Sequence, residues 1–585
     1  MDLKYNTKEY SRMERELQSF PIDVEPIDSV FFIFAVKAKT NDGEIRRMLE
    51  KNKLYYLLKG FEVQEDKVIV DSNRYNRPIY DFFMETYSSS VPHVSVSAIV
   101  GENGAGKSSL IEFEIRLINN LATVVFGEYS KEPGWEHLHY INNTSGELFY
   151  LYNNLLYKLT VTDRRVELKV YKNPIEQENG NRIFYMRADS EEILLNECND
   201  NNIPFVGIRE ERKDDFKNVL SQFFYTIVLN QSVYAYNTHD YKKECNNEEY
   251  EVKVRKCYNT DKKRYYSTAE KCWLNGLFHK NDGYQIPIVL SPYRFEGNFN
   301  INRENELAYE RLISLLVHYK EFRHINEHLL VTNFVLKKKE HSYDIHYIHK
   351  KLGYKQFDNK SYVLMKKIIR ETWISKLQLK NITLRKNGYT SLAMNYLVYK
   401  TLKIASTYEE YDNFREKYLV KKKPFEESEF RELVSRTINN RSHVTNKLYR
   451  TFAFLIWNIY DIKKGQSQIK VDDIAKRWIK EQPNKKLNEQ LGTINLVLQA
   501  FIPPPFFELN IELEELKNHD IVSFEALSSG EKQQTYIISS LLYHLSNIDS
   551  VMNDRCTNER IVYNNVHLVL EEIELYFHPQ YKRNL

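Results

Sequence analysis

The residues best suited to do chemistry lie in a glycine-rich segment that reads Gly101-Glu102-Asn103-Gly104-Ala105-Gly106-Lys107-Ser108. This segment fits the pattern G-x-x-x-x-G-K-[ST] of a phosphate-binding loop. Its glycines allow the backbone to turn so that several N–H groups point at one anion. We expect Lys107 to reach the β- and γ-phosphates of a nucleotide, and the hydroxyl of Ser108 to bind Mg²⁺.

A second group of small residues lies much later in the chain, in Leu527-Ser528-Ser529-Gly530-Glu531-Lys532-Gln533. It precedes a segment with apolar residues at helical spacing. Small residues at the start of a helix leave backbone N–H groups and Ser hydroxyls exposed to an anion. The same residues are also common as a simple helix cap, so both interpretations stay open at this stage.

Two carboxylates follow an apolar strand close to the last residue. The strand is Leu568-Val569-Leu570, and Glu571 and Glu572 come directly after it. One of these acids could face Mg²⁺, and the next could polarise an attacking water. Buried strands end in acids for structural reasons as well, so this pattern alone does not decide the function.

The segments around the glycine-rich loop predict strands and one helix. Residues 94–100 form an apolar run that leads into the loop, and residues 110–118 have the apolar spacing of a helix. Residues 148–171 alternate with a period near two, with Asn153-Asn154 and Asp163-Arg164 as hairpin turns. We therefore expect an antiparallel β lobe beside a nucleotide-binding core.

A long region with helical spacing, few glycines and many lysines extends from about residue 302 to residue 500. Pro503-Pro504-Pro505 ends it, because consecutive prolines cannot continue a helix. Residues 506–513 alternate as a strand, and the last 70 residues predict a helix followed by the strand 566–570. Heptads are not sustained in this region, which disfavours a long coiled coil.

Composition limits the classes of protein to consider. The chain has 585 residues, too many for a single compact core, with 42% hydrophobic and 28% charged residues. It contains no apolar run of membrane-spanning length and no apolar N-terminal segment of signal-peptide type, so we expect no membrane partner and a cytoplasmic protein. Five scattered cysteines do not form a disulfide framework.

Charge is unevenly distributed along the chain. The net charge is +3, but residues 337–386 hold 14 Lys or Arg against four acids, a local balance of +10 that leaves −7 for the rest. Aromatic residues are interleaved with these lysines: Tyr343, Tyr347, Tyr354, Tyr362 and Trp373. Lysines would neutralise phosphates and aromatic rings could stack on unpaired bases of DNA or RNA. A solvated helical surface has the same composition, so that interpretation stays open.

Two sets of residues resemble metal sites only weakly. Cys245, Cys257, Cys272 and His279 lie within 35 residues but lack the close pair of cysteines that zinc sites usually contain. His341, His346 and His349 lie in the basic segment. We interpret the first set as ordinary thiols and the second as a solvated face.

The three motifs, in this order, resemble those of ABC-type ATPases of the chromosome-maintenance, DNA-repair and OLD (overcoming lysogenisation defect) group. Residues 101–108 are similar to its Walker A motif, residues 527–533 to its signature, and residues 568–572 to its Walker B motif. Glu574 and His578-Pro579 are similar to the tail of OLD-like bacterial AAA-type proteins, many of which act in anti-phage defence. The resemblance covers residues 25–300 and 500–585.

This resemblance implies an α/β fold: a P-loop ABC-type head with an antiparallel β lobe and a large, mainly helical insertion. Residues 1–300 would form the N-terminal part of the head, residues 301–500 the basic insertion, and residues 501–585 the C-terminal part. The head would dimerise around ATP and Mg²⁺, hydrolyse the ATP, and gate nucleic-acid sensing or an effector such as a separately encoded nuclease.

The resemblance also assigns roles to single residues. Glu572 would be the catalytic base, acting with Lys107, and Ser108, Gln231 and Glu571 would bind the metal. ATP would contact both the loop and, from the partner copy, the signature, through Gly101, Asn103, Gly104, Gly106, Lys107, Ser108, Ser109, Ser528, Ser529 and Gly530. Gln231 is similar in position to a Q-loop residue because it follows the apolar strand 226–229.

Two departures from the family pattern open alternatives. Glu571 stands where the family has Asp, and the family's switch histidine, expected beyond the Walker B strand, does not appear before Leu585. We expect the sequence to be truncated. A non-catalytic, nucleotide-gated scaffold for an effector nuclease and the ATPase half of an OLD-like nuclease are the alternatives to an active ATPase.

Overall fold

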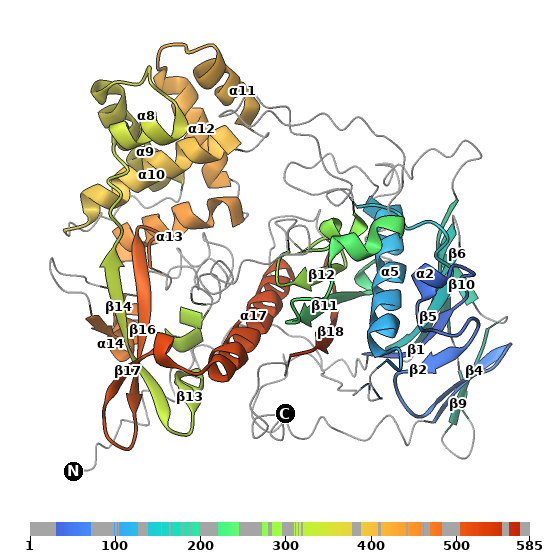
Figure 1. Cartoon of the computed structure of the whole chain (residues 1–585). Helices are drawn as coiled ribbons and strands as arrows, with labels where there is room; N and C mark the ends of the chain where they lie inside the picture. The colour runs from blue at the N-terminus through green and yellow to red at the C-terminus, as the bar shows by residue number, and fades with distance from the viewer. Residues whose placement is uncertain are drawn as a thin grey trace.

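The computed structural model of the chain is mixed α/β, with antiparallel sheets and several helices (Figure 1). The structure describes residues 31–71, 104–126, 138–153, 155–162, 165–172, 174–176, 181–186, 190–197, 220–244, 272–278, 284–294, 320–376, 388–407, 411–439, 443–457, 468–481, 503–552 and 561–573, together with 99, 102, 309, 312–313, 315–317 and 460. The predicted mixed α/β class is confirmed.

The largest sheet is antiparallel and six-stranded. In spatial order its strands are β10 (Ser190–Glu197), β7 (Arg165–Tyr171), β6 (Leu155–Thr162), β5 (Gly146–Tyr152), β1 (Phe31–Ala38) and β2 (Leu54–Tyr56). Tyr152 pairs with Leu155 and Thr162 pairs with Arg165, which confirms the two hairpins predicted between residues 148 and 171.

A smaller four-stranded sheet packs on one face of this large sheet. Its strands, in order, are β3 (Phe61–Val63), β4 (Lys67–Asp71), β9 (Asn181–Tyr185) and β8 (Ile175–Glu176). Side chains alternate along β1, so that Phe32 and Phe34 face Val68 of the small sheet while Ile33 and Val36 face the opposite side. The two faces of β1 therefore belong to two different hydrophobic clusters.

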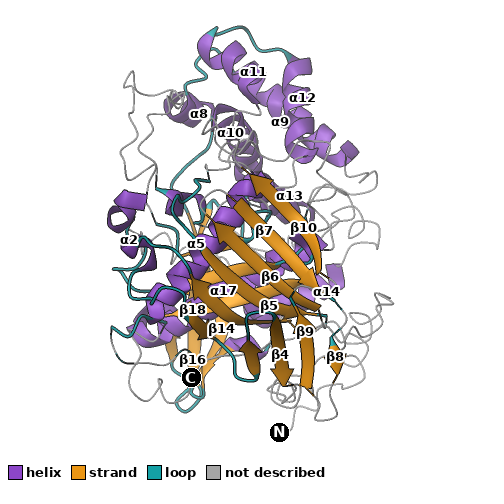
Figure 2. Cartoon of the chain, turned by 90° about the vertical axis from the view of Figure 1, so that its right-hand side faces the viewer, coloured by secondary structure: helices purple, strands orange, loops and turns teal. Residues whose placement is uncertain are grey.

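Helix α5 (Lys107–Phe126) covers the other face of the large sheet and separates it from a parallel sheet (Figures 1 and 2). The parallel sheet contains β12 (Ile288–Ser291), β11 (Phe224–Asn230) and β18 (Asn565–Glu571). Residues 109–125 of α5 are all buried, as expected for a helix packed between two layers. Of the predicted strand 94–100, only Ile99 lies among the described residues.

The region expected to be mainly helical also contains strands. A further antiparallel sheet has the order β13 (His324–Asn326), β14 (Leu329–Lys338), β16 (Phe507–Glu515) and β17 (Ile521–Ser523), with β15 (Gln468–Lys470) also on β14. Val331, Phe334 and Leu336 are buried along β14, which pairs with β16 over its whole length. Residues 329–338 thus share a sheet with residues 507–515; residues 309, 312–313 and 315–317 are helical before β14, and the helices described next follow it.

The helical part consists of α8 (Ile345–Leu352), α9 (Asn359–Lys376), α10 (Thr390–Thr407), α11 (Asp412–Arg415), α12 (Glu427–Asn439) and α13 (His443–Trp457). Within this part, α9 packs on α12 and α10 packs on α13 (Figure 1). Further helices in the described residues are α2 (Gly43–Arg46), α14 (Val471–Glu481), the 3₁₀ segments η2 (Thr238–Glu244), η3 (Trp273–Gly276), η4 (Glu321–Arg323) and η7 (Phe524–Ala526), and the π-helix η6 (Glu416–Val420).

Helix α17 (Ser529–Met552) joins the two halves of the structure. Tyr536, near its N-terminus, packs against the hydrophobic cluster of the helical part, whereas Ile537 and Ile548 belong to the cluster that contains α5. Figure 1 shows α17 running from the sheet of β16 and β17 to the parallel sheet. None of the helices in the described part of the chain has the length and apolar character needed to cross a membrane.

Gly146 of β5 provides a test of the packing between α5 and the large sheet. A Cβ atom at this position would lie 2.6 Å from Cε1 of Phe113 and 2.8 Å from the carbonyl oxygen of Lys37. We expect Gly146→Ala to lower the free energy of unfolding by about 1–3 kcal/mol, because neither neighbour can yield without moving the backbone or the core. Urea denaturation measures this change.

Gly43→Ala is the matched control, because a Cβ at Gly43 would meet no atom within 4 Å. Its free energy of unfolding should differ from wild type by less than about 1 kcal/mol. Equal effects of the two substitutions would contradict the close contact between α5 and β5.

Candidate functional site

The glycine-rich loop turns tightly into the start of α5. Gly104 and Gly106 have φ angles of 84° and 90°, in the region that only glycine adopts readily. The amide of Ala105 donates to the carbonyl of Glu102 at 3.1 Å, and the amide of Leu110 donates to that of Gly106 at 3.0 Å. Each of the two glycines is therefore required by its backbone conformation.

The side chains at this helix start are partly accessible. The ammonium group of Lys107 donates to the carbonyl of Glu102 at 3.0 Å, so it lies over the loop. Ser108 is exposed, whereas Ser109 is buried. Two further predicted contacts, Gly101 and Asn103, lie outside the described residues.

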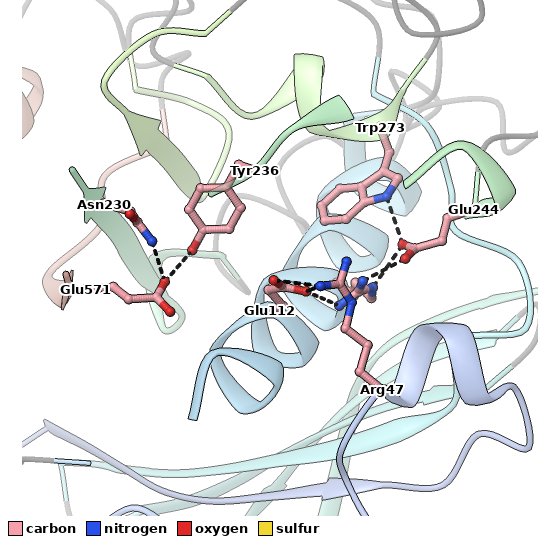
Figure 3. Close-up of polar contacts among 8 residues, drawn as sticks. Arg47, Glu112, Asn230, Tyr236, Glu244, Trp273 and Glu571 are labelled. Carbon is pink, nitrogen blue, oxygen red and sulfur yellow. Dashed lines mark hydrogen bonds and ion pairs between the residues drawn. The ribbon is translucent and has the colours of Figure 1, made fainter. Parts of the chain in front are cut away.

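The acid-ended strand β18 lies beside β11, in parallel register. Asn230 is the Cα partner of Glu571, so the last residues of both strands meet at the same edge of the sheet. Nδ2 of Asn230 donates to Oε2 of Glu571 at 2.8 Å, and the hydroxyl of Tyr236 donates to the same oxygen at 3.0 Å (Figure 3). Gln231, the predicted Q-loop residue, directly follows Asn230 and is half-buried.

Tyr236 fixes the orientation of the Glu571 carboxylate. Burial, together with the charge of Glu571, raises the pKa of Tyr236 well above its ordinary value, so its hydroxyl stays protonated and remains a donor at neutral pH. The neighbouring acid Glu572 is exposed and has a φ angle of 53°. The two acids of the predicted motif therefore differ in environment, one held by two donors and the other at the surface.

Arg294 supports the turn after β11. Its Nη2 donates to the carbonyls of Asn230 at 3.1 Å and Ser232 at 2.7 Å, and the side chain is buried. Burial lowers the pKa of Arg294 to about 10, which still leaves the group charged at neutral pH. Neither Tyr236 nor Arg294 was found from the sequence, because the contacts of both depend on the fold and not on a local motif.

A buried ion network anchors α5 to the segments around it. Arg116 is fully buried and binds Glu244 in bidentate fashion, with Nη2–Oε1 at 2.7 Å and Nε–Oε2 at 2.9 Å. Nε1 of Trp273 donates to Oε2 of Glu244 at 3.0 Å. Nη1 of Arg47 lies 2.9 Å from Oε2 of Glu112 (Figure 3). This network connects α2, α5, η2 and η3.

Tyr241 lies within the same network. The guanidinium groups of Arg47 and Arg116 lie 4.7 Å and 5.5 Å from the centre of its ring, both within cation–π range. Burial raises the pKa of Glu112, and the charges of Arg116 and Arg47 oppose this effect. The carboxylates of this network are held beside cations, so its role is to fix α5 in place.

The signature-like segment forms a helix cap. Ser528 and Glu531 form a capping box, with the Ser528 amide donating to Oε2 of Glu531 at 3.0 Å and the Glu531 amide donating to Oγ of Ser528 at 3.3 Å. Nδ2 of Asn326 donates to Oε1 of the same Glu531 at 2.8 Å. Ser529 is exposed and Gly530 is half-buried.

Within one chain, the structure does not bring the signature-like segment to the phosphate loop. Leu527 belongs to the cluster of the helical part, whereas Leu110 belongs to the cluster around α5. Figure 1 shows the N-terminus of α17 beside β17, away from α5. The segment therefore acts as the cap of its own helix, α17. A contact between this segment and a phosphate loop would require the loop of a second copy.

Four of the aromatic residues in the basic segment are not available to stack on bases. Tyr343, Tyr354, Tyr362 and Trp373 are buried in the core of the helical part, so their rings are already packed. Tyr347 is half-buried. Their helical spacing reflects the core, and the sequence-based idea that all five could stack on bases is wrong for these four.

The weak metal patterns gain no support from the described residues. Cys272 is buried, and Cys245, Cys257 and His279 lie outside the described part of the chain. Nε2 of His349 lies 2.7 Å from the carbonyl oxygen of Phe357. No group of three or more His, Cys, Asp or Glu residues among those that the structure describes is placed to hold a metal ion.

Comparison with protein-family models, with curated proteins and with solved structures found no match to this chain.

The buried network predicts that replacing Arg116 lowers the free energy of unfolding much more than replacing the exposed Arg431. We expect Arg116→Met to lower the free energy of unfolding by about 3–5 kcal/mol, because it leaves buried Glu244 without its bidentate partner. The control is Arg431→Met, in which an arginine 41% exposed loses its contacts with Glu371 and Glu427. Arg431→Met should lower the free energy of unfolding by less than about 1 kcal/mol. Urea denaturation of both variants measures the difference, and similar values would contradict the anchoring role of Arg116.

Proposed function

We propose that this chain binds ATP with Mg²⁺ and hydrolyses it, as a P-loop ATPase of ABC type in which two copies close over the nucleotide. The observation that carries the proposal is the combination of two features. A loop with the phosphate-binding pattern leads into the start of α5, with glycines at the positive φ angles of 84° and 90°. An acid, Glu571, ends a parallel strand packed in the same hydrophobic cluster as α5.

The loop has the donors that a polyphosphate requires. Backbone N–H groups at the start of α5, the positive end of the helix dipole and the ammonium of Lys107 all favour an anion. Lys107 now contacts a loop carbonyl, which a phosphate oxygen would replace as its partner. The exposed hydroxyl of Ser108 is suited to Mg²⁺, which prefers oxygen ligands.

The edge where β11 and β18 end has the groups for activating water. Glu571, oriented by Asn230 and Tyr236, would bind the metal, and the adjacent Gln231 would contact the metal and the attacking water. Glu572 would act as the general base. Its exposure in a single copy fits a site that is completed when a second copy closes over it.

The placement of the signature-like segment supports closure by a second copy. Ser528, Ser529 and Gly530 directly follow Leu527, which belongs to the hydrophobic cluster of the helical part and not to that of α5. The start of a long helix is suited to contact a γ-phosphate bound by another copy. We propose that ATP bridges the two copies and that its hydrolysis switches a bound partner, such as nucleic acid or an effector nuclease.

A nucleotide-gated scaffold is the second candidate, and one observation favours it. Oε2 of Glu571 already accepts hydrogen bonds from two donors, at 2.8 Å and 3.0 Å. An acid held in this way is less able to move toward a metal ion. In this version ATP is bound and the two copies close, but turnover is absent or very slow.

The first test compares ATP binding and turnover in the wild type and two variants. We expect Lys107→Ala to weaken ATP binding by at least about tenfold, because the charged contact with the phosphates is lost. Glu572→Gln should bind ATP as the wild type does and turn it over about 10² to 10⁴ times more slowly. Isothermal titration measures binding, and phosphate release measures turnover. Lys423→Ala, at an exposed lysine, is the control and should change neither quantity.

Each outcome of this test decides between the candidates. Wild-type turnover in Lys107→Ala would overturn the proposal. Tight ATP binding by the wild type, without phosphate release, would favour the scaffold over the ATPase. Absence of ATP binding in the wild type would overturn both.

The second test separates the capping role of the signature-like segment from a contact between copies. We expect Ser529→Arg to reduce ATP-dependent dimerisation of Glu572→Gln, because a large charged side chain would obstruct the approach of a second copy. The Ser528–Glu531 capping box stays intact in this variant, so its melting temperature should stay close to that of its parent. Light scattering with and without ATP measures the mass, and an unchanged dimer fraction would remove Ser529 from the interface.

A further inference from the structure

Three helices of the helical part contain basic residues and no acids. The helices α8, α10 and α13, of which α10 packs on both others, contain no Asp or Glu. The Lys and Arg residues of these helices are Lys350, Lys351, Lys400, Lys403, Lys447 and Arg450. By contrast, α9 and α12 contain both signs of charge and join them in ion pairs such as Arg431–Glu371. The helices α8, α10 and α13 therefore have no acid of their own to neutralise their positive charge.

Three lysines on α10 and α13 lie near one another. The positive charges of Lys447 and Lys403, together with burial of the amine, lower the pKa of Lys400 to about 8. Lys403 and Lys447 are exposed. Lys400 and Lys403 lie one turn apart on α10, which packs on the helix of Lys447. Like charges held together repel one another, and a bound anion offsets this repulsion.

Aromatic rings lie next to these lysines. The rings of Tyr347 on α8 and Tyr399 on α10 are half-buried, with centroids 5.3 Å apart. The exposed His341 ring lies 5.1 Å from that of Tyr347. Nζ of Lys403 lies 5.9 Å from the centre of the Tyr399 ring. Of these three rings, the sequence predicted a stacking role only for Tyr347.

Two acids lie close in the chain to this surface. Asp344 precedes α8 and accepts a hydrogen bond from the amide of Tyr347 at 2.9 Å, which caps the helix, and the exposed Glu340 directly precedes His341. On α9, Nζ of Lys366 lies 4.3 Å from the ring centre of Tyr362, whose hydroxyl donates to the carbonyl of Tyr343 at 3.2 Å. Two further lysines, Lys337 and Lys338, are exposed at the end of β14, which leads directly to His341.

We propose that the surface formed by His341, Tyr347, Tyr399, Lys400, Lys403 and Lys447 binds single-stranded nucleic acid. Lysines neutralise successive phosphates, and the half-buried rings stack on an unpaired base. A duplex fits less well, because its bases are already stacked on one another. This surface shares no residue with the phosphate loop, so the inference does not depend on ATP binding.

The test is fluorescence anisotropy of the full chain with a labelled 20-mer of oligothymidylate. The double variant Lys403→Glu, Lys447→Glu should bind at least about tenfold more weakly and lower the slope of log affinity against log salt by about 1.4, as expected for two lost phosphate contacts. The control double variant Lys422→Glu, Lys423→Glu makes the same charge change at exposed lysines between η6 and α12. It should bind like wild type.

Two variants at one position test stacking apart from charge. Tyr399→Ala should weaken binding by about 5-fold or more, whereas Tyr399→Phe, which keeps the ring, should bind like wild type. Thermal melting of each variant shows whether the fold is kept. Because Tyr399→Phe preserves the packing, an equal loss in both Tyr399 variants would contradict the role of the ring.

Besides an equal loss in both Tyr399 variants, three results would overturn the proposal: equal affinities of the two double variants, an unchanged affinity of a folded Tyr399→Ala variant, or tighter binding of a 20-base-pair duplex than of the single strand. The second result would indicate a general polyanion site. Lys107→Ala should bind the oligonucleotide as wild type does without ATP, so failure of the ATPase proposal and failure of this one give different results.

Discussion

The burial of α5 on all sides is the constraint on which the candidate site depends. Residues 109–125 lie between the six-stranded sheet and the parallel sheet, yet the helix contains several charged and amide side chains. Each of these would cost several kcal/mol if buried without a partner. Arg116 binds Glu244, Oε1 of Glu114 lies 3.1 Å from Nε2 of His567 on β18, and Asn120 exchanges hydrogen bonds with the backbone of Ile141. Because these partners come from different elements, the position of α5 is fixed on both of its faces.

A fixed α5 also fixes the geometry of the edge that holds the acids. His567 lies on β18 four residues before Glu571, so the Glu114–His567 contact sets α5 relative to the strand that ends in the two acids. Arg294 holds the turn after β11, and Tyr236 from that turn orients Glu571. The polar groups are therefore positioned by contacts among residues far apart in the sequence. Such contacts restrict the carboxylate before any ligand binds, which is the preorganisation that catalysis or tight binding requires.

Local sequence patterns were enough to predict several helices and strands. The features that sequence analysis missed depend on packing between residues far apart in the chain. The hairpins at 148–171, the helix after the glycine-rich loop, and the strand before Glu571 follow from alternation, turn residues and apolar spacing, which act within about ten residues. Strand β14 was missed because its alternation is broken by a register shift between Val331 and Asn333, and its partner β16 lies far along the chain. Trp373 and Tyr354 were assigned to a surface because sequence spacing gives a helix face without showing what covers it. No sequence motif marks Tyr236 or Arg294, because their roles depend on contacts with residues that the fold brings near them.

Helix α17 is the element through which the two halves can influence each other. Its first turn is fixed by Glu531, which caps the helix through Ser528 and also accepts a hydrogen bond from Asn326, next to the strand β14 that leads to the cationic helices. Its later turns pack in the cluster of α5 through Ile537 and Ile548. A continuous helix transmits a displacement along its axis because its backbone hydrogen bonds resist stretching. A ligand on the helical part and a nucleotide at the loop would therefore be coupled only if each binds one position of α17 more tightly than another. If both favour the same position, each strengthens binding of the other, and the coupling free energy cannot exceed the smaller of the two ligands' preferences.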